Sequence, residues 1–386
     1  MKKNIAVVTG SRAEYGLLKP LIRAIAEEPS FNLQLIATGM HLSAEFGSTY
    51  KEIEADGISI AEKVDCKLSS DSAEAITESI GTALQGFAKA YKKLDPYLIV
   101  LLGDRTEILA AAIAASIKAL PIAHIHGGET TEGSYDEASR HAITKMSFLH
   151  FTSAEAYRKR VIQLGEAPER VFNVGAIGID SIKKLPLLSR ADFENAINFK
   201  LDKKNILITF HPVTLENKTA EHQFKALLNS MDKLKDTSLI FTKPNSDKDG
   251  AVIVKMIDAY VSANSSKAVS FTSLGQLRYL SALQYVDLVI GNSSSGILEV
   301  PSFKKPTINM GDRQKGRLMP ESIINCEPNE PAIDQALNKS FSPEFLKNIQ
   351  GQNSLYGDGN TTPQIMKILT KFETSGIKKP FYDIKF

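Results

Sequence analysis

At 386 residues, with 43% hydrophobic and 23% charged residues, the chain has the composition of a globular protein and the length of two domains. Its formal net charge of +2 gives no reason to expect binding to nucleic acid or to a membrane surface. The two cysteines, Cys66 and Cys326, lie far apart in the sequence and lack metal-ligand spacing. We therefore expect neither a disulfide framework nor a zinc site, and the low cysteine content fits a reducing cytoplasm.

No secretory leader or membrane span is predicted. The apolar run after the N-terminal MKKN is too short for a signal peptide, and the apolar helix expected at 108–117 is too short to cross a bilayer. We therefore expect a cytoplasmic enzyme.

Apolar runs alternate with helical patterns in two successive halves of the chain. In the first half, strands are expected at 4–9, 31–38, 97–102, 121–125, 148–152 and 171–174, and helices at 16–28, 71–94 and 108–119. After a mixed-charge linker at 183–191, strands are expected at 205–210, 238–242, 287–292, 307–310 and 323–324, and helices at 220–234, 251–262, 274–283, from 297 onward and at 363–372. This alternation is typical of doubly wound parallel sheets, so two α/β halves are predicted, with ligand sites in the cleft between them.

The stretch from Leu120 to His141 carries the densest set of acids and bases. Its apolar start is expected to be a buried strand that Gly127 and Gly128 interrupt, and a helical pattern begins at Asp136. The polar groups thus follow the carboxyl end of a strand, where open α/β sheets bind ligands. They indicate a proton-transfer site, with a solvated loop and a capped helix as the alternative. The set is His124, His126, Glu129, Glu132, Asp136, Glu137, Arg140 and His141.

Cations and histidines also recur at other predicted strand ends. A single one is usually a helix cap or turn former, but several at equivalent positions in both halves favour a shared ligand site. They are Arg12, His41, Arg105 and His211.

A second polar stretch, GNSSSG at 291–296, lies between a predicted strand and a predicted helix. Backbone N–H groups and hydroxyls at a helix start bind anions, so phosphate is the favoured ligand and N-cap chemistry alone is the alternative. Glu299 could accept hydrogen bonds from two neighbouring hydroxyls, such as those of a ribose. Arg313 and Arg317 lie in GDRQKGR, which is either a solvated loop or a clamp for a diphosphate.

Eight short motifs in this order resemble the hydrolysing UDP-N-acetylglucosamine 2-epimerases of sialic-acid and legionaminic-acid biosynthesis, over nearly the whole chain. The motifs are SRAEYG (11–16), GDRTE (103–107), HIHGGE (124–129), DEASRHAIT (136–144), FHPVT (210–214), GNSSSG (291–296), GDRQ (311–314) and YGDGN (356–360).

The resemblance implies a GT-B fold, in which two Rossmann-like domains flank a central cleft and the C-terminal one binds most of the UDP. The N-terminal domain is expected to span 1–175 together with the C-terminal helix, about 363–386, and the UDP-binding domain 176–362. The implied reaction eliminates UDP to a 2-acetamidoglycal, which water then hydrates with inversion at carbon 2. Proton transfer on two faces of the sugar requires more than one acid or base.

Position by position, the resemblance assigns Asp104 and Asp136 to catalysis. A human bifunctional member of the family has glutamate where this chain has His126, so either His126 or Glu129 is expected to take that role. The expected contacts to the UDP-sugar are Arg12, His41, Arg105, Arg140, His141, His211, Asn245, Ser293, Ser294, Ser295, Gly296, Glu299, Arg313 and Arg317.

The predicted substrate is UDP-N-acetylglucosamine, giving UDP and N-acetylmannosamine, and the alternative is UDP-2,4-diacetamido-2,4,6-trideoxyglucose. A GT-B glycosyltransferase and a catalytically silent UDP-sugar-binding regulator are more distant alternatives. No metal or other cofactor is implied, and no nucleic-acid or membrane partner. Relatives assemble through the N-terminal domain, so a homodimer or homotetramer is expected.

Overall fold

The computed structural model describes residues 2–67, 70, 72–132, 135–212, 219–244, 250–352, 354–373 and 377–385. The chain forms two compact units, each built on a parallel sheet. The first unit comprises Met1–Glu129, Asp136–Lys183 and Tyr356–Phe386, and the second comprises Thr130–Tyr135 and Lys184–Leu355. The predicted doubly wound α/β architecture is confirmed. The domain boundaries given above stay a prediction.

The seven-stranded sheet of the first unit has the order β3-β2-β1-β4-β5-β6-β7. The chain runs outward from β1 to β3 and then returns to the other side of β1, so the strand order reverses between β1 and β4. Ligands of doubly wound sheets bind at the carboxyl ends of the strands beside such a reversal. The strands are β1 (Lys3–Thr9), β2 (Phe31–Thr38), β3 (Ile60–Val64), β4 (Leu98–Leu102), β5 (Ile122–Ile125), β6 (Leu149–Thr152) and β7 (Val171–Asn173).

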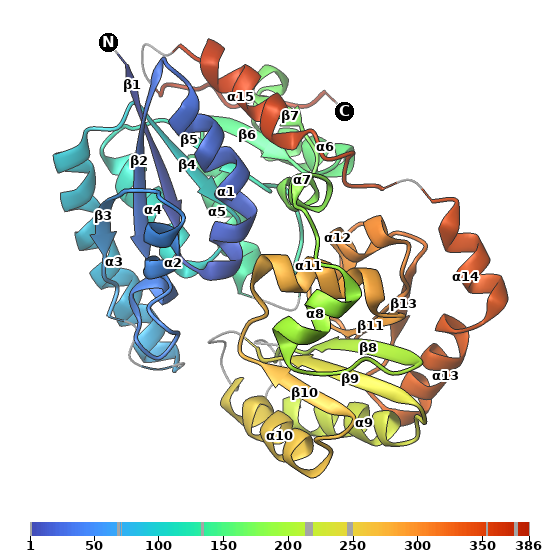
Figure 1. Cartoon of the computed structure of the whole chain (residues 1–386). Coiled ribbons are helices and arrows are strands. Elements are labelled where there is room, and N and C mark those ends of the chain that lie inside the picture. Colours follow the sequence, from blue (N-terminus) through green and yellow to red (C-terminus); the bar gives the residue numbers. More distant parts are fainter. Residues whose placement is uncertain are drawn as a thin grey trace. The chain divides into compact units, whose positions relative to one another are not determined.

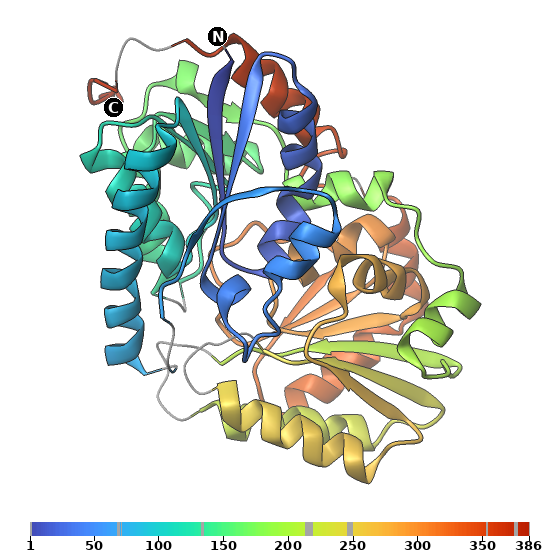
Figure 2. The ribbon, with the colours of Figure 1, turned by 60° about the vertical axis from the view of Figure 1, so that its left-hand side comes forward.

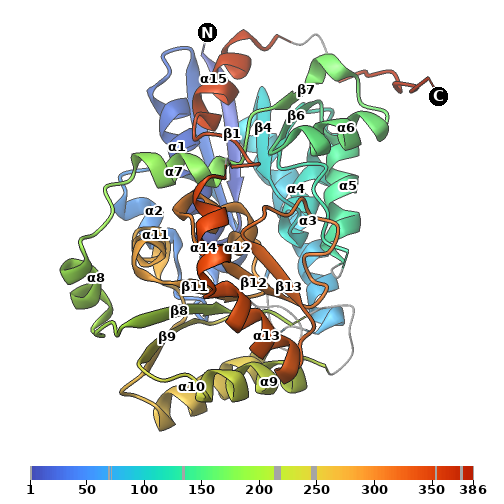
Figure 3. The ribbon, with the colours of Figure 1, turned by 90° about the vertical axis from the view of Figure 1, so that its right-hand side faces the viewer.

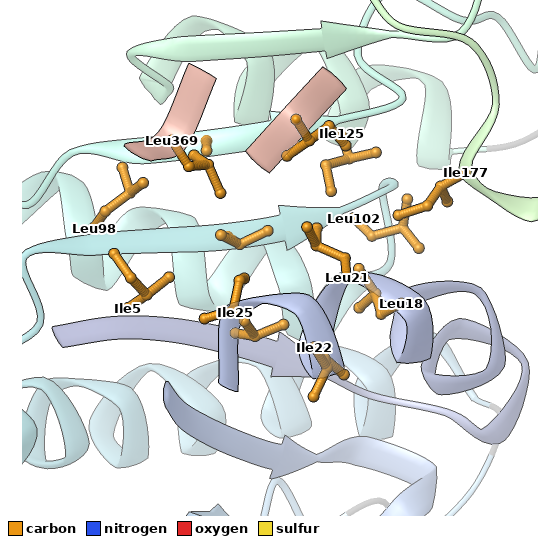
Figure 4. Packing of buried hydrophobic residues seen from close by; sticks show 14 of the residues in the cluster. Ile5, Leu18, Leu21, Ile22, Ile25, Leu98, Leu102, Ile125, Ile177 and Leu369 are labelled. Carbon is orange, nitrogen blue, oxygen red and sulfur yellow. The ribbon is translucent and has the colours of Figure 1, made fainter. Parts of the chain in front are cut away.

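Helices cover both faces of this sheet because its strands are apolar on both sides. Leu98, Val100 and Leu102 of β4 pack with α1 (Arg12–Glu27) and α15 (Thr361–Lys371), as Figure 4 shows for part of this cluster. Ile99 and Leu101 face the opposite layer. That layer contains α3 (Ala73–Leu94), α4 (Thr106–Ile117) and Ile143 of α5 (Asp136–Met146). Figures 1 and 2 show these layers from two directions.

The remaining elements of the first unit connect strands or join the C-terminal segment to the sheet. They are the 3₁₀ helices Gly39–Leu42 and Pro168–Arg170 and the helices α2 (Tyr50–Ala55), α6 (Glu155–Gln163) and α7 (Ile177–Lys184). Asp180 of α7 is fully buried and accepts from the backbone N–H groups of Thr361, at 2.8 Å, and Thr362, at 2.6 Å. It thereby caps α15 across a long gap in the sequence.

The second unit has a six-stranded sheet in the order β10-β9-β8-β11-β12-β13. Its strands are β8 (Lys204–Thr209), β9 (Thr237–Thr242), β10 (Ala268–Phe271), β11 (Leu288–Gly291), β12 (Thr307–Met310) and β13 (Ile323–Cys326). On one face, β8 and β9 pack against α9 (Ala220–Asp232), α10 (Gly250–Ala263) and α13 (Glu330–Ser340). Figure 1 shows α8 (Arg190–Ile197), α11 (Gly275–Tyr285) and α12 (Ser295–Leu298) on the other face. Figure 3 shows α13 followed by α14 (Pro343–Gln350).

Several sequence-based boundaries need correction. The first helix begins at Arg12 rather than 16, because the Ser11 side chain caps it by accepting from the Glu14 N–H. The helix expected from 297 is α12, which gives way to a 3₁₀ helix at Val300–Phe303 that contains Pro301, a residue without an N–H to donate. The expected linker 183–191 contains the end of α7 and the start of α8. Among the helices in the described ranges, none combines the length and hydropathy of a bilayer span.

We expect Asp180→Ala to lower the free energy of unfolding by about 2 kcal/mol, because two buried N–H groups lose a charged acceptor. Asp180→Asn, which keeps one acceptor oxygen, should lose less. Urea unfolding followed by circular dichroism measures both, with the exposed Asp383→Ala as the control. Equal stability of Asp180→Ala and the wild type would contradict the capping role.

Candidate active site

Polar side chains of the first unit follow the carboxyl ends of β1, β4, β5 and β6. Asp104 lies two residues beyond β4, and its carboxylate forms an ion pair with the guanidinium of Arg140 from α5. Arg140 is buried and also donates from Nη1 to the His126 carbonyl oxygen at 3.4 Å. Asp104, Arg140 and His126, which come from three different segments, are therefore connected.

The loop after β5 turns sharply at its two glycines. A Cβ atom on Gly127 would lie 2.8 Å from Thr144 Oγ1, and one on Gly128, where φ is +78°, would lie 2.5 Å from the Tyr157 carbonyl oxygen. Both distances are shorter than real contacts, so only glycine fits without a rearrangement. The turn places Glu129 back beside His126, with Glu129 Oε1 3.3 Å from His126 Nδ1. Ser153, directly after β6, donates to the same oxygen at 2.6 Å.

Two histidines of the first unit are held in buried structural positions. His124 Nε2 lies 2.7 Å from the carbonyl oxygen of Gly103, the residue before Asp104, and Nδ1 lies 3.1 Å from Thr144 Oγ1. His41, an expected substrate contact, lies between the hydroxyls of Thr9 and Thr49 at 3.1 and 2.8 Å. Burial lowers the pKa of His124 to about 3 and that of His41 to about 4, so both rings are neutral near pH 7.

Two of the cations expected to contact the UDP-sugar, Arg12 and Arg105, each have a carboxylate partner in this structure. Arg12 forms an ion pair with Glu52, and Arg105 Nε lies 2.7 Å from Glu107 Oε1. Burial raises the pKa of Glu107, but the charge and hydrogen bond of Arg105, together with hydrogen bonds from the Glu107 backbone and Thr106, outweigh burial and the net shift is downward. Glu107 therefore stays charged beside Arg105.

A second buried carboxyl group, Glu14, lies close to this pair. Glu14 Oε2 accepts from the Gly10 N–H at 2.5 Å, and Oε1 is buried without a hydrogen-bond partner among the described residues. Burial, together with repulsion from Glu107, raises the pKa of Glu14 to about 8. Glu14 is therefore protonated near neutral pH.

The two other first-unit candidates lie on α5. Asp136 is its first residue, a position at which the helix dipole favours an acid. Its side chain is half-buried. His141 Nε2 lies 3.0 Å from Glu137 Oε1, one helical turn earlier.

In the second unit, Asn292 joins the loops that follow β8 and β11. Its Oδ1 accepts from the His211 N–H and its Nδ2 donates to the His211 carbonyl oxygen, both at 2.7 Å. The carbonyl oxygen of Asn292 accepts from Arg313 at 3.1 Å and Gln314 at 2.9 Å. His211 and Arg313 thus lie around one buried amide.

The GNSSSG turn leads into a helix of only four residues, α12. Gly291 has a φ of +141°, and a Cβ atom there would lie 1.9 Å from the Thr209 carbonyl oxygen, so this position requires glycine. The Ser295 hydroxyl contacts both Glu299 and Tyr279. Burial raises the pKa of Glu299 to about 7, while the Ser295 hydrogen bond opposes the shift.

The structure therefore brings the predicted residues together in two groups, one in each unit. The first contains Asp104, His126, Glu129 and Arg140, and the second contains His211, Arg313 and the 292–299 segment, in which Ser293, Ser294, Ser295, Gly296 and Glu299 lie. Arg317 is buried in the loop after β12, and Asn245 lies outside the described residues. The roles of all these residues in binding or catalysis stay predictions.

Sequence reasoning missed three residues of these groups: Ser153, Asn292 and Gln314. Ser153 directly follows a predicted strand, which was a usable signal, and Asn292 lies inside the GNSSSG motif. Gln314 lies in the GDRQ motif, but its residue type gave no reason to expect a buried contact, since a glutamine in a charged loop is ordinarily solvated.

Comparisons with known proteins decide the family. Residues 23–370 match the family model described as UDP-N-acetylglucosamine 2-epimerase. The chain belongs to this family. It is 45% identical over 347 residues, or 90% of each chain, to a Campylobacter jejuni protein named GDP/UDP-N,N'-diacetylbacillosamine 2-epimerase (hydrolyzing). It is 39% identical to the Escherichia coli polysialic acid biosynthesis protein P7, over 99% of this chain and 98% of that one.

Solved structures of family members share the fold. The crystal structure of UDP-GlcNAc 2-epimerase from Neisseria meningitidis bound to UDP-GlcNAc matches with a TM-score of 0.81 and 18% identity, covering 96% of this chain and 100% of that one. The GT-B class expected for this hydrolysing 2-epimerase family is thus confirmed.

The raised pKa of Glu14 predicts a pH-dependent contribution to stability. The unfolded state ionises Glu14 near its model value of 4.5 and the folded state near 8, so stability is lost as pH rises between these values. Glu14→Gln keeps the hydrogen bond to Gly10 but cannot ionise. Its stability relative to the wild type should therefore rise between pH 5 and pH 8, by at most about 1.4 kcal/mol per pH unit.

Thermal unfolding of both proteins across this pH range measures the difference, with Glu27→Gln at an exposed position of the same helix as the control. A constant difference in stability at all pH values would show that Glu14 does not titrate as described.

Proposed function

We propose that this enzyme hydrolyses and epimerises UDP-2,4-diacetamido-2,4,6-trideoxyglucose, which is UDP-N,N'-diacetylbacillosamine, to UDP and the free 2-epimer. One observation carries this choice of substrate: the 45% identity over 90% of each chain to the Campylobacter jejuni relative whose name gives that sugar. The structure bound to UDP-GlcNAc is only 18% identical to this chain and carries no argument on substrate.

The reaction requires two proton transfers and one water. A base removes the hydrogen at carbon 2 as a proton, the electron pair of that C–H bond forms the C1=C2 double bond, and the C1–O bond to the diphosphate breaks with its electrons on UDP. Water then adds its hydroxyl to carbon 1, and a proton is delivered to the opposite face of carbon 2. General acid and base groups on both faces supply these steps.

Asp104 is the strongest candidate for one of these transfers. It lies at the carboxyl end of β4, next to the reversal of strand order, and its side chain is 17% exposed to solvent. Arg140 holds the carboxylate in a fixed direction, which is what a proton-transfer group needs. Asp136 is the other half-buried acid proposed for catalysis.

The second unit is proposed to bind UDP. In this proposal, His211, Arg313 and the serines of GNSSSG meet the diphosphate, and Glu299 accepts from the ribose hydroxyls. Burial raises the pKa of Glu299 to about 7 because its charged form has lost hydrogen bonds to water. Hydrogen bonds donated by two ribose hydroxyls would replace them and stabilise the charged form.

UDP-N-acetylglucosamine is the second candidate substrate. It is favoured by the 39% identity to the polysialic acid biosynthesis protein of Escherichia coli, since N-acetylmannosamine is the precursor of sialic acid. The two candidate sugars differ at carbons 4 and 6, so a direct comparison separates them.

We expect the trideoxy donor to give the higher kcat/KM when both donors are assayed side by side in deuterated water. The released sugar should carry deuterium at carbon 2 and the mannose configuration, because the proton returned to carbon 2 comes from a group in exchange with solvent. Nuclear magnetic resonance of the product measures the isotope and the configuration. Protium at carbon 2, or the gluco configuration, would reject the elimination mechanism, and a preference for UDP-N-acetylglucosamine would reject the substrate.

Asp104→Asn and Asp136→Asn keep the shape of each side chain and remove its charge. We expect kcat to fall by about 10²–10⁴-fold, a typical loss for a general acid or base, while UDP still raises the melting temperature. The exposed Asp258→Asn on α10 is the matched control. Wild-type turnover of either variant would remove that aspartate from the catalytic set.

A further inference from the structure

Both ring nitrogens of His126 are engaged by other groups of the first unit. The backbone N–H of Ile177 donates to His126 Nε2 at 3.2 Å, so Nε2 carries no hydrogen. The neutral ring must therefore carry its proton on Nδ1, which lies 3.3 Å from Glu129 Oε1. The contacts of the ring define one tautomer, with Nδ1–H directed at the Glu129 carboxylate.

The partners of His126 are themselves fixed by packing. The Ile177 side chain is fully buried in the cluster with Leu102 and Ile125, near which Figure 4 shows it, so its N–H cannot easily turn away. Glu129 is 1% exposed, and its Oε1 also accepts from Ser153, which is 1% exposed. Two donors that meet one oxygen fix the rotation of the carboxylate.

The backbone of His126 is also constrained. Its φ of +66° lies in the left-handed region, which is unfavourable for residues other than glycine. Its N–H donates to the Phe151 carbonyl oxygen at 2.8 Å, and its carbonyl oxygen accepts from Arg140. A strained residue tied through its backbone and both ring nitrogens is built to hold a position.

We propose that His126 is a positioning residue that aims the Glu129 carboxylate, and that Glu129 takes part in one of the two proton transfers at carbon 2. The inference rests on the proposed function. A ring that accepts from an anchored N–H and donates to a carboxylate cannot exchange a proton with a sugar unless a buried hydrogen bond breaks. Ser153 is the second positioning residue of Glu129.

Matched amide substitutions separate the two roles. His126→Gln offers an oxygen to Ile177 and an N–H to Glu129, so its kcat should stay within about tenfold of the wild type, whereas His126→Ala should lose more. Both should leave KM nearly unchanged and release the epimerised sugar with deuterium at carbon 2. Glu129→Gln should lower turnover by about 10²-fold or more, or release the 2-acetamidoglycal in place of the hydrated sugar.

Two further measurements guard against variants that merely unfold. Ser153→Ala should lower kcat without changing KM or the melting temperature appreciably. In nuclear magnetic resonance spectra of protein labelled with ¹⁵N-histidine, the ring resonances that disappear in His126→Gln belong to His126. Their chemical shifts should be those of the Nδ1–H tautomer, both with and without UDP. His222→Gln, at an exposed position of α9, is the matched control.

The proposal is overturned if His126→Gln loses as much turnover as His126→Ala, if it alone releases the glycal, or if Glu129→Gln keeps wild-type turnover and product. These outcomes are distinct from failure of the proposed function, which the wild type alone reveals by giving no free UDP and no epimerised sugar from either donor.

Discussion

Backbone pairing beyond the ends of the parallel strands is the constraint on which the first-unit site depends. After β4, β5 and β7 end, the N–H groups of Gly103, His126 and Val174 still donate to carbonyl oxygens of Ile125, Phe151 and Thr152 on the neighbouring strand. Buried N–H groups need such partners, so the loops cannot separate immediately. Asp104, His126 and Ser153 therefore leave the sheet side by side, and the glycine turn then returns Glu129 to them.

Charge compensation is the second constraint on this region. Glu107 keeps its charge because Arg105 lies against it, and Asp104 likewise forms an ion pair, with Arg140. Glu14 has no such cation close enough to outweigh burial and Glu107, and it takes up a proton instead. Since a buried charge without a partner is costly, the pairing of each acid decides whether it is a carboxylate or a neutral carboxyl group at neutral pH.

Sequence patterns predicted the interior of the fold better than its edges. The continuous apolar runs of β1, β4, β8 and β11 mark strands buried on both faces. The edge strands β3 (IAEKV) and β10 (AVSF) were missed, because each is short and is defined mainly by pairing with one neighbour. A helical pattern also failed to mark α13, although Asn329 caps it.

The same division holds for the candidate sites. Strand-end positions predicted that His126 and Glu129 would lie at the ligand-binding edge of the sheet, because parallel strands end at a common edge, whereas Asp104 was assigned through the family resemblance. The pairing of Arg140 with Asp104, and of Asn292 with His211, depends on which helix or loop packs across that edge. Such contacts between distant segments leave no periodic signal in the chain.

Asn292 in the second unit and His126 in the first both join two loops through one donor and one acceptor. Each is a neutral group with one donor and one acceptor, and each joins two loops that a charged side chain could not join in the same way. A glutamate at position 126 could accept from the Ile177 N–H but could not donate to Glu129, and it would place a second carboxylate beside the first. Histidine at this position therefore gives Glu129 a hydrogen-bond donor where a glutamate would place a like charge.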